Sequence, residues 1–151
     1  LQRYVAELFG EKLPVLFVRD RVPSVDDERR YIEEMTQSER SLLLVAEVDG
    51  DIVGMLDFHG HKEPQRAHAG ELGISTAKGW RGRGVGTKLL GHLLEWAAAR
   101  DFRRIELRVF SNNEGAIRLY ERFGFVVEGR QVEAVKVGDG FVDIVYMAKF
   151  M

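Results

Sequence analysis

The stretch GWRGRGVGTKLLGHLLEWAAAR, residues 79–100, places a loop rich in glycine and arginine directly before an apolar helix. Gly82, Gly84 and Gly86 carry a high backbone entropy cost and destabilise a helix, so they mark a loop. The segment after them has one apolar helical face, made of Leu89, Leu90, Leu93, Leu94 and Ala97. The chain therefore places its most flexible residues where a helix begins, which indicates that the backbone there approaches something closely.

Two nucleotide-binding motifs fit this loop poorly. A P-loop has the pattern G-x-x-x-x-G-K-[ST], but here Lys88 follows Thr87 instead of a glycine. Leu89 also stands where the magnesium-binding hydroxyl belongs. A dinucleotide-binding fingerprint has the pattern G-x-G-x-x-G, whereas the spacing here is G-x-G-x-G, and such a domain does not open with a β-hairpin.

A third interpretation needs only general physics. Backbone N–H groups of a glycine loop at a helix N-terminus form a cradle for an anion, and glycines let that backbone come close to a pyrophosphate. Arg81, Arg83 and Lys88 add positive charge where phosphates would lie. The alternative is a tight turn whose arginines are simply solvated.

The composition is that of an ordinary globular protein. Its 151 residues suffice for one domain with a buried core, which we expect to span residues 1–151. The formal net charge of −2 gives no general attraction to nucleic acid or to anionic lipid. No apolar run approaches the roughly 20 residues that span a bilayer, so neither nucleic acid nor membrane is an expected partner. The absence of cysteine excludes disulfides and thiolate chemistry, and it fits a cytoplasmic protein.

Hydrophobic periodicity predicts an α+β (mixed α/β) protein with four helices and six strands. Helical spacing covers residues 1–9, 25–37, the segment after the glycine loop, and 114–123. Strand-like runs cover residues 41–48, 52–60, 67–75, 104–110, 125–135 and 141–150. Asp49 and Gly50 predict a hairpin turn, Ser24 and either Asn112 or Asn113 are candidate helix N-caps, and Gly124 marks a helix end.

Three motifs of this sequence resemble motifs of the GNAT N-acetyltransferase superfamily, and they follow one another along the chain as they do in that family. The run from Arg81 to Gly86 fits that family's R/Q-x-x-G-x-G/A motif, and GELGIS, residues 70–75, is similar to its fourth strand. The later N-x-x-A-x-x-x-Y-x-x-x-G-F signature is matched by Asn113, Ala116, Tyr120, Gly124 and Phe125. The last two strands resemble the family's final hairpin, so the resemblance covers about Ser41 to Met151.

The resemblance implies the GNAT fold, a mostly antiparallel twisted sheet with helices on both faces. That sheet splays between the family's strands 4 and 5, which correspond here to residues 67–75 and 104–110. Gly70 and Gly73 weaken the first of these strands and suggest a β-bulge there. The family's first strand has no counterpart before residues 1–9, so the edge of the 41–48 strand would be open to pairing with a second chain. A homodimer is therefore a possible assembly.

The resemblance also implies acetyl-CoA as the cosubstrate. Its pyrophosphate would lie on the loop amides of residues 81–87, and its pantetheine arm would run beside residues 72–75 as an added strand. Asn113 would cap the helix of the N-x-x-A-x-x-x-Y-x-x-x-G-F signature, close to that arm. The implied cofactor-binding residues are Leu72, Gly73, Ile74, Ser75, Arg81, Gly82, Arg83, Gly84, Val85, Gly86, Thr87, Asn113, Ala116 and Tyr120.

Acetyl transfer to an amine poses two proton problems. A lysine-like amine has a pKa of about 10 and arrives protonated, so a base must remove that proton, and the departing thiolate then needs a proton. Tyr120 matches the family's usual acid position and carries a phenol donor. The alternative for Tyr120 is a core residue on an amphipathic helix.

The candidate base is Glu71, in the strand that feeds the cofactor site. It alternates with Leu72 and therefore faces away from it, and it could act directly or through water. The alternative is a strand-edge glutamate paired with a basic residue. His59, His61 and His68 can also serve as bases. His59 and His61 share one side of an extended segment, but no further ligand has fixed spacing, so no metal site is expected.

The amine acceptor stays open at the sequence level. The resemblance puts substrate choice in Leu13–Pro23 and in Val135–Phe141, and the first segment contains both charge signs. Amino acids, polyamines, other small amines and protein N-termini are all possible acceptors. A non-catalytic domain that binds or senses acyl-CoA through the same loop is the alternative function.

Overall fold

The computed structural model describes residues 1–11 and 22–151, and within them the elements lie where periodicity predicts them. The segment 13–23, expected to influence substrate choice, falls almost entirely outside the described residues. The helices are α1 (Gln2–Gly10), α2 (Val25–Gln37), α3 (Val85–Ala98) and α4 (Glu114–Arg122), with a short 3-10 helix at Pro64–Arg66.

Local chemistry sets the limits of two of these helices. Ser24 begins α2 with a capping box, in which its side chain and that of Asp27 each accept a hydrogen bond from the other's backbone amide. The Asn113 side chain accepts a hydrogen bond from the Ala116 amide (3.3 Å) and begins α4. Gly124, at φ +83°, follows the end of α4. All three predicted signals are therefore confirmed.

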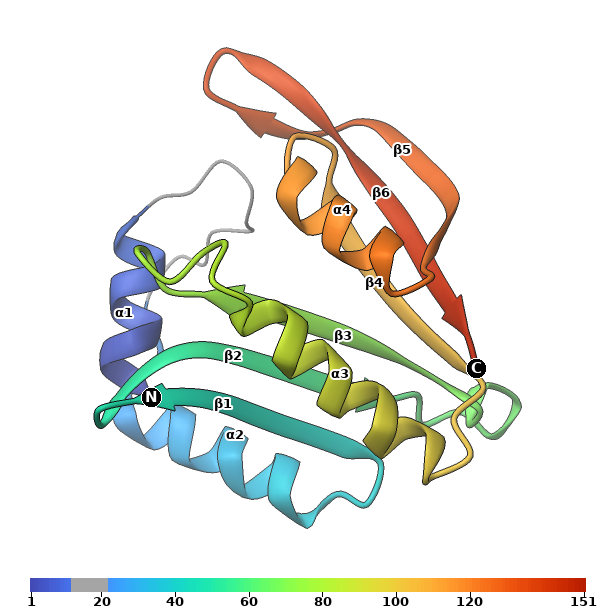
Figure 1. Ribbon diagram of the computed structural model, residues 1–151, viewed down its shortest axis with the longest axis horizontal. Helices are drawn as coiled ribbons and strands as arrows, with labels where there is room; N and C mark the ends of the chain where they lie inside the picture. The colour runs from blue at the N-terminus through green and yellow to red at the C-terminus, as the bar shows by residue number, and fades with distance from the viewer. Residues whose placement is uncertain (12–21) are drawn as a thin grey trace.

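Six strands form a single sheet in the order β1-β2-β3-β4-β6-β5 (Figure 1). Every neighbouring pair is antiparallel except β3 and β4, which are parallel. The strands are β1 (Ser41–Val48), β2 (Asp51–Gly60), β3 (Ala69–Thr76), β4 (Arg104–Phe110), β5 (Val126–Val137) and β6 (Gly140–Phe150).

The parallel pair at the middle of the sheet is short. β3 and β4 are paired only from Ala69 opposite Arg104 to Glu71 opposite Glu106. Beyond that point they diverge, and the ribbons open into a wedge between β1-β2-β3 and β4-β6-β5 (Figure 1). The predicted fold, a mostly antiparallel sheet splayed between these two strands, is therefore confirmed.

Helices cover both faces of the sheet. α3 and α4 pack on one face, over a core whose fully buried residues include Leu56, Phe58, Leu90, Leu93 and Ile105. α1 packs on the opposite face through a smaller cluster of Tyr4, Val5 and Leu8. α2 lies on that second face as well, because Tyr31 of α2 donates a hydrogen bond to Asp57 of β2 (2.7 Å). We call these the α3–α4 face and the α1–α2 face.

The prediction of a β-bulge at Gly70 and Gly73 is wrong. The register between β2 and β3 runs without a shift from Gly54 opposite Thr76 to Gly60 opposite Gly70. The two glycines instead make room for neighbours on β2. A Cβ at position 70 would lie 2.3 Å from the Phe58 ring, and one at position 73 would lie 2.4 Å from the Asp57 carboxylate. These glycines therefore permit close side-chain approach in a regular strand.

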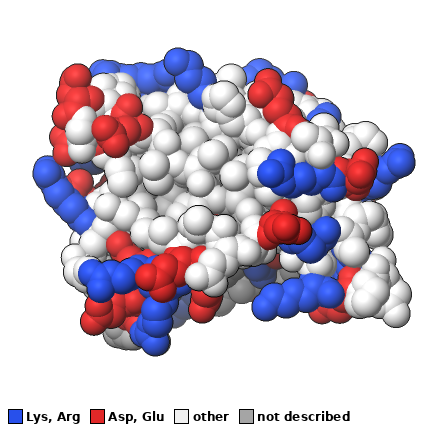
Figure 2. Space-filling view, turned by 90° about the horizontal axis from the view of Figure 1, so that it is seen from below, with Lys and Arg blue, Asp and Glu red and all other residues white. Residues whose placement is uncertain are grey.

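Neither positive nor negative charge predominates on the face of the molecule seen in Figure 2. There, acidic and basic side chains of both signs are interspersed around an uncharged centre. β1 is an edge strand of the described sheet, and its pairing with a second chain stays a prediction. None of the helices in the described ranges has the length and apolar character needed to cross a bilayer.

Candidate active site

The divergence of β3 and β4 opens a cavity of about 640 Å³, a size typical of small-molecule sites. Its walls come from both sides of the sheet, since Leu8 of α1 and Leu119 and Tyr120 of α4 all contribute. The cavity therefore passes through the sheet from the α1–α2 face to the α3–α4 face. Of the predicted cofactor-binding residues, all line it except Arg83.

The glycine loop ends at the N-terminus of α3, where backbone amides are free. Gly84 is the N-cap, in the left-handed region at φ +81°, and no side chain caps the helix. The first hydrogen bond of the helix runs from the Lys88 amide to the Gly84 carbonyl (3.0 Å), so the amides of residues 85–87 have no partner within the helix. These three amides, at the positive end of a 14-residue helix, can bind an anion.

The loop glycines have two different roles. Gly82 and Gly84 have positive φ values of 73° and 81°, and a Cβ at either position would meet no atom within 4 Å. They are needed for the turn. A Cβ at Gly86 would lie 3.0 Å from Leu119, so this glycine lets α3 and α4 pack closely.

The loop arginines are less free than the sequence suggests. Arg81 donates hydrogen bonds to the Glu11 carboxylate (2.7 Å) and to the Thr76 carbonyl (3.1 Å). It therefore ties the loop to the end of α1. The Arg83 guanidinium lies over the Trp80 ring at 5.2 Å. The backbone amides of residues 85–87 are thus more available to a bound anion than the side chains of these two arginines.

The predicted cofactor strand offers unpaired backbone to the cavity. Beyond Glu71, the side of β3 that faces β4 has no pairing partner among the described strands. Its free N–H and C=O groups can hydrogen-bond an extended acyl-pantetheine arm, as one strand bonds another. The Ser75 hydroxyl forms a hydrogen bond with the Tyr4 hydroxyl (2.8 Å), and this bond anchors α1 to β3.

Tyr120 lines the cavity from α4 and is almost fully buried, with 5% of its surface exposed. Burial raises the pKa of its phenol, because the phenolate would be poorly solvated. The phenol therefore keeps its proton at neutral pH. Among residues 1–11 and 22–151, no side chain or backbone group forms a hydrogen bond with that hydroxyl, which leaves it available as a donor.

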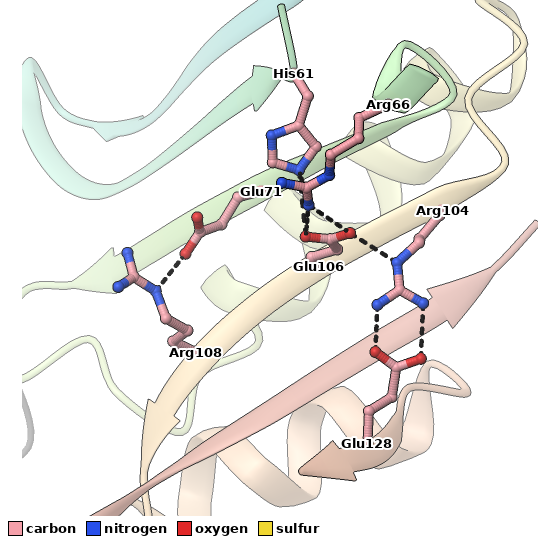
Figure 3. A network of polar contacts seen from close by, with 7 residues as sticks. All are labelled: His61, Arg66, Glu71, Arg104, Glu106, Arg108 and Glu128. Carbon is pink, nitrogen blue, oxygen red and sulfur yellow. Dashed lines mark hydrogen bonds and ion pairs between the residues drawn. The ribbon is translucent and has the colours of Figure 1, made fainter. Parts of the chain in front are cut away.

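Glu71 lies on the α1–α2 face, opposite His59 on β2 and Glu106 on β4. Its carboxylate accepts a hydrogen bond from Nε of Arg108 at 2.6 Å, across the point where the strands separate (Figure 3). Arg108 lines the cavity, whereas Glu71 is not part of the cavity wall and lies next to it through this contact with Arg108. The alternative of a glutamate paired with a basic residue therefore holds for the free protein, while the predicted role as base stays a prediction.

Glu106, next to this pair, belongs to a separate and saturated network (Figure 3). It contacts His61 (3.2 Å), Arg66 (2.9 Å) and Arg104 (2.7 Å), and Arg104 also binds Glu128. Burial would raise the pKa of the Glu106 carboxyl, but its hydrogen bonds to these basic groups outweigh burial and hold the pKa below its usual range. His61 is thus committed to this network.

His59 lies in a second cluster that the sequence did not indicate. Its Nε2 is 3.4 Å from the Asp57 carboxylate, which also accepts a hydrogen bond from Tyr31 at 2.7 Å. The hydrogen bond to Asp57 raises the pKa of His59. Burial would raise the pKa of Asp57, but the hydrogen bonds from His59 and Tyr31 lower it overall. His68 lies in the turn before β3, and the described residues contain no group of three potential metal ligands.

A family model described as the acetyltransferase (GNAT) family matches residues 6–125. The chain belongs to this family. A GNAT relative, the L-amino acid N-acetyltransferase AaaT of Escherichia coli strain K12, is 36% identical over 110 residues. That match covers 70% of this chain and 66% of the relative, so the chain spans just under two thirds of the relative's length.

Solved structures share the GNAT fold along the whole chain. An acetyltransferase of this family from Streptococcus pneumoniae has a TM-score of 0.87 at 26% identity, covering 99% of this chain and 95% of that one. The structure of yncA from Salmonella typhimurium, determined with its cofactor acetyl-CoA, has a TM-score of 0.82 at 21% identity, covering 99% and 90%. At that identity the second likeness concerns the fold alone.

Acetyl-CoA is the cosubstrate of GNAT enzymes, and the residues of this cavity suit it. The uncapped amides of residues 85–87 can hold a pyrophosphate, and the unpaired side of β3 can hold the pantetheine arm. The protonated phenol of Tyr120 then lies on the wall of the same cavity. These groups fit acetyl-CoA, and the part that each residue takes in binding it stays a prediction.

Proposed function

We propose that this protein transfers the acetyl group of acetyl-CoA to a primary amine by direct attack of the amine nitrogen. The observation that carries the proposal is the cavity that is lined from both faces of the sheet. It joins free helix amides on the α3–α4 face to the Glu71–Arg108 pair at its rim on the α1–α2 face. A thioester held from one face can thus meet an amine that arrives from the other.

Acetyl-CoA is bound by the residues predicted for it. These are Leu72–Ser75 on β3, residues 81–87 of the loop, and Asn113, Ala116 and Tyr120 of the last motif. Backbone amides dominate the anion site, because Arg81 is already paired with Glu11. Arg83 lies outside the cavity wall and supports the loop through Trp80.

Two side chains handle the protons. Acetyl-CoA supplies the acetyl group as an activated thioester. Glu71 accepts the proton of the incoming ammonium, directly or through water, so that the nitrogen lone pair becomes free to form the new C–N bond. Tyr120 keeps its proton at neutral pH because burial raises its pKa, and it donates that proton to the leaving thiolate as the C–S bond breaks. The nitrogen then loses its second proton, which returns through water to the Tyr120 phenolate, so that the products are the amide, CoA thiol and one proton on Glu71.

The acceptor is a primary amine of a small molecule, an amino acid or a peptide N-terminus. The 36% identical relative is named for acetylation of L-amino acids, which favours an amino acid among these. A cytoplasmic site of action fits this substrate class and the cysteine-free composition.

Release of CoA thiol, corrected for hydrolysis, tests the function against a panel of amino acids, polyamines, other small amines and peptides. Binding of acetyl-CoA is measured in parallel by calorimetry. Thiol release that depends on an amine supports acetyl transfer. Binding without release for every amine overturns transfer in favour of a sensing domain, and absence of binding overturns the whole assignment.

A further inference from the structure

The Glu71–Arg108 pair stands where the paired part of β3 and β4 ends. Backbone pairing stops at Glu71 opposite Glu106, and Arg108 is two residues further along β4 on the same face. The Arg108 side chain reaches back across the opening gap to Glu71 (Figure 3), with Nε at 2.6 Å from the carboxylate. The pair therefore lies at the mouth of the cavity and is not buried inside the sheet.

Both members of this pair have bonding capacity left over. Within the described part of the chain, the only side-chain hydrogen bond of Arg108 is to Glu71, and the only one of Glu71 is to Arg108. Glu71 also lies opposite His59, whose pKa its charge helps to raise. The pair uses Nε alone of the five guanidinium donors and one carboxylate oxygen. The two side chains are 49% and 37% exposed. The neighbouring Glu106 differs, since three basic side chains already surround it.

A preformed pair of opposite charges is complementary to a zwitterion. A free α-amino acid carries its ammonium and its carboxylate on one carbon, so it can place the first on Glu71 and the second on Arg108. Each protein charge then exchanges one partner for another, and no charge is left unpaired at the cavity mouth. The two free Nη groups of Arg108 also match the planar geometry of a carboxylate.

Other arginines of the cavity are poorly placed for this task. Arg81 is held by Glu11 and by a backbone carbonyl. Arg118 and Arg122 come from α4, on the α3–α4 face, and Arg118 is paired with Glu114 at 3.1 Å. Arg81 is thus committed to α1, and Arg118 and Arg122 lie on the other face, so of these four arginines only Arg108 lies beside Glu71, the group that accepts the amine proton.

We propose that Arg108 determines substrate specificity by binding the α-carboxylate of a free amino acid, while Glu71 receives its α-amino group. This inference rests on the proposed acetyl transfer and narrows its acceptor. An amino-acid amide, a decarboxylated amine or a peptide N-terminus lacks the carboxylate at that carbon. Such an acceptor would draw Glu71 away from Arg108 and leave the guanidinium without a counter-charge.

The first test uses the wild-type protein alone. The ratio kcat/KM is measured for L-amino acids, for the matching amino-acid amides and for the matching decarboxylated amines, with acetyl-CoA held at saturation. We expect a preference of at least about tenfold for the free acids, as loss of a charge-assisted hydrogen bond commonly produces. Equal kcat/KM for acid, amide and amine overturns the inference and leaves acetyl transfer intact.

The second test uses Arg108→Gln and Arg108→Lys. We expect Arg108→Gln to remove the preference for acid over amide, mainly through a higher KM for the amino acid, with the KM for acetyl-CoA unchanged. Arg108→Lys retains the charge without the planar fork, so it should restore part of the preference. A uniform loss for acids and amides alike would show a structural role only and overturn the inference.

Arg130→Gln is the matched control. Arg130 is also a half-exposed strand arginine paired with an acid, Asp143, on the neighbouring strand, but it does not line the cavity. It should leave the acid-to-amide ratio unchanged, and a change there would count against a specific role for Arg108. If the wild type acetylates no acceptor at all, the proposed function fails before the inference is reached.

Discussion

Replacing Gly84 by aspartate gives the sharpest test of the anion cradle. Gly84 is the exposed N-cap of α3 at φ +81°, and a Cβ there would meet no atom within 4 Å. Asparagine has the same shape as aspartate, and both tolerate the left-handed region better than other residues. The pair Gly84→Asp and Gly84→Asn therefore differs in one negative charge placed beside the free amides of residues 85–87.

The effects on stability and on binding have opposite signs. A carboxylate at a helix N-terminus is stabilising, by about 0.3–1 kcal/mol, so Gly84→Asp should unfold no more easily than Gly84→Asn. Against a phosphate at about 4 Å, the same carboxylate is unfavourable by about 1 kcal/mol in water and about 4 kcal/mol at an effective dielectric constant near 20. The loop is exposed, so we expect about 1–2 kcal/mol, which is roughly 5–30-fold weaker binding.

Titration of acetyl-CoA by calorimetry measures this difference, and the fluorescence of Trp80, which lines the cavity, offers a second readout. The gap between the two variants should shrink between about 0.01 M and 1 M salt, because ions screen exposed charges. Equal Kd values for Gly84→Asp and Gly84→Asn at low salt would refute the cradle. A lower free energy of unfolding for Gly84→Asp would refute the electrostatic account of the helix end.

Three further changes test other parts of the structure. Tyr120→Phe should lower kcat by about 100-fold with little change in the Kd of acetyl-CoA, and equal losses in both would remove its role as acid. The pKa of His59 is raised by its hydrogen bond to Asp57, so this contact stabilises the fold fully below about pH 6.5 and is lost as pH rises through the raised pKa. The Tm advantage of wild type over His59→Gln should therefore shrink from about pH 6 to pH 8, and a constant advantage would contradict this. Gly70→Ala should lower the free energy of unfolding by about 1–3 kcal/mol through overpacking, whereas the control Gly129→Ala, with no atom within 4 Å of its Cβ, should change it by less than about 0.5 kcal/mol; urea denaturation that gives similar values for both would oppose the packing argument.

Features that depend on near neighbours in the chain could be predicted from the sequence. The apolar spacing of residues 25–37 and the Ser24 cap give the observed bounds of α2, and the run at 41–48 gives those of β1. The glycine loop could be recognised as an uncapped helix start, because positive φ values and free amides are local properties of that stretch.

Features that depend on residues far apart could not be predicted in this way. A glycine within a strand can mark a bulge or a close approach, and only the position of the Phe58 ring decides for Gly70. Arg81 forms an ion pair with Glu11, which lies 70 residues earlier in the chain. Glu71 meets Arg108 across 37 residues. In each case the partner is set by sheet register or helix packing, which a local pattern does not contain.

The sequence by itself determined the order of the elements, the family and the glycine loop at the start of α3, because periodicity, capping residues and short motifs act over a few residues. Only the tertiary structure decided which charges remain available at the cavity. In the folded chain, Arg81 is paired with Glu11, and three basic side chains surround Glu106. Glu71 contacts Arg108 at the point where β3 and β4 separate. The physical reason is that Coulomb and hydrogen-bond energies depend on separation in space, and the splayed sheet sets that separation.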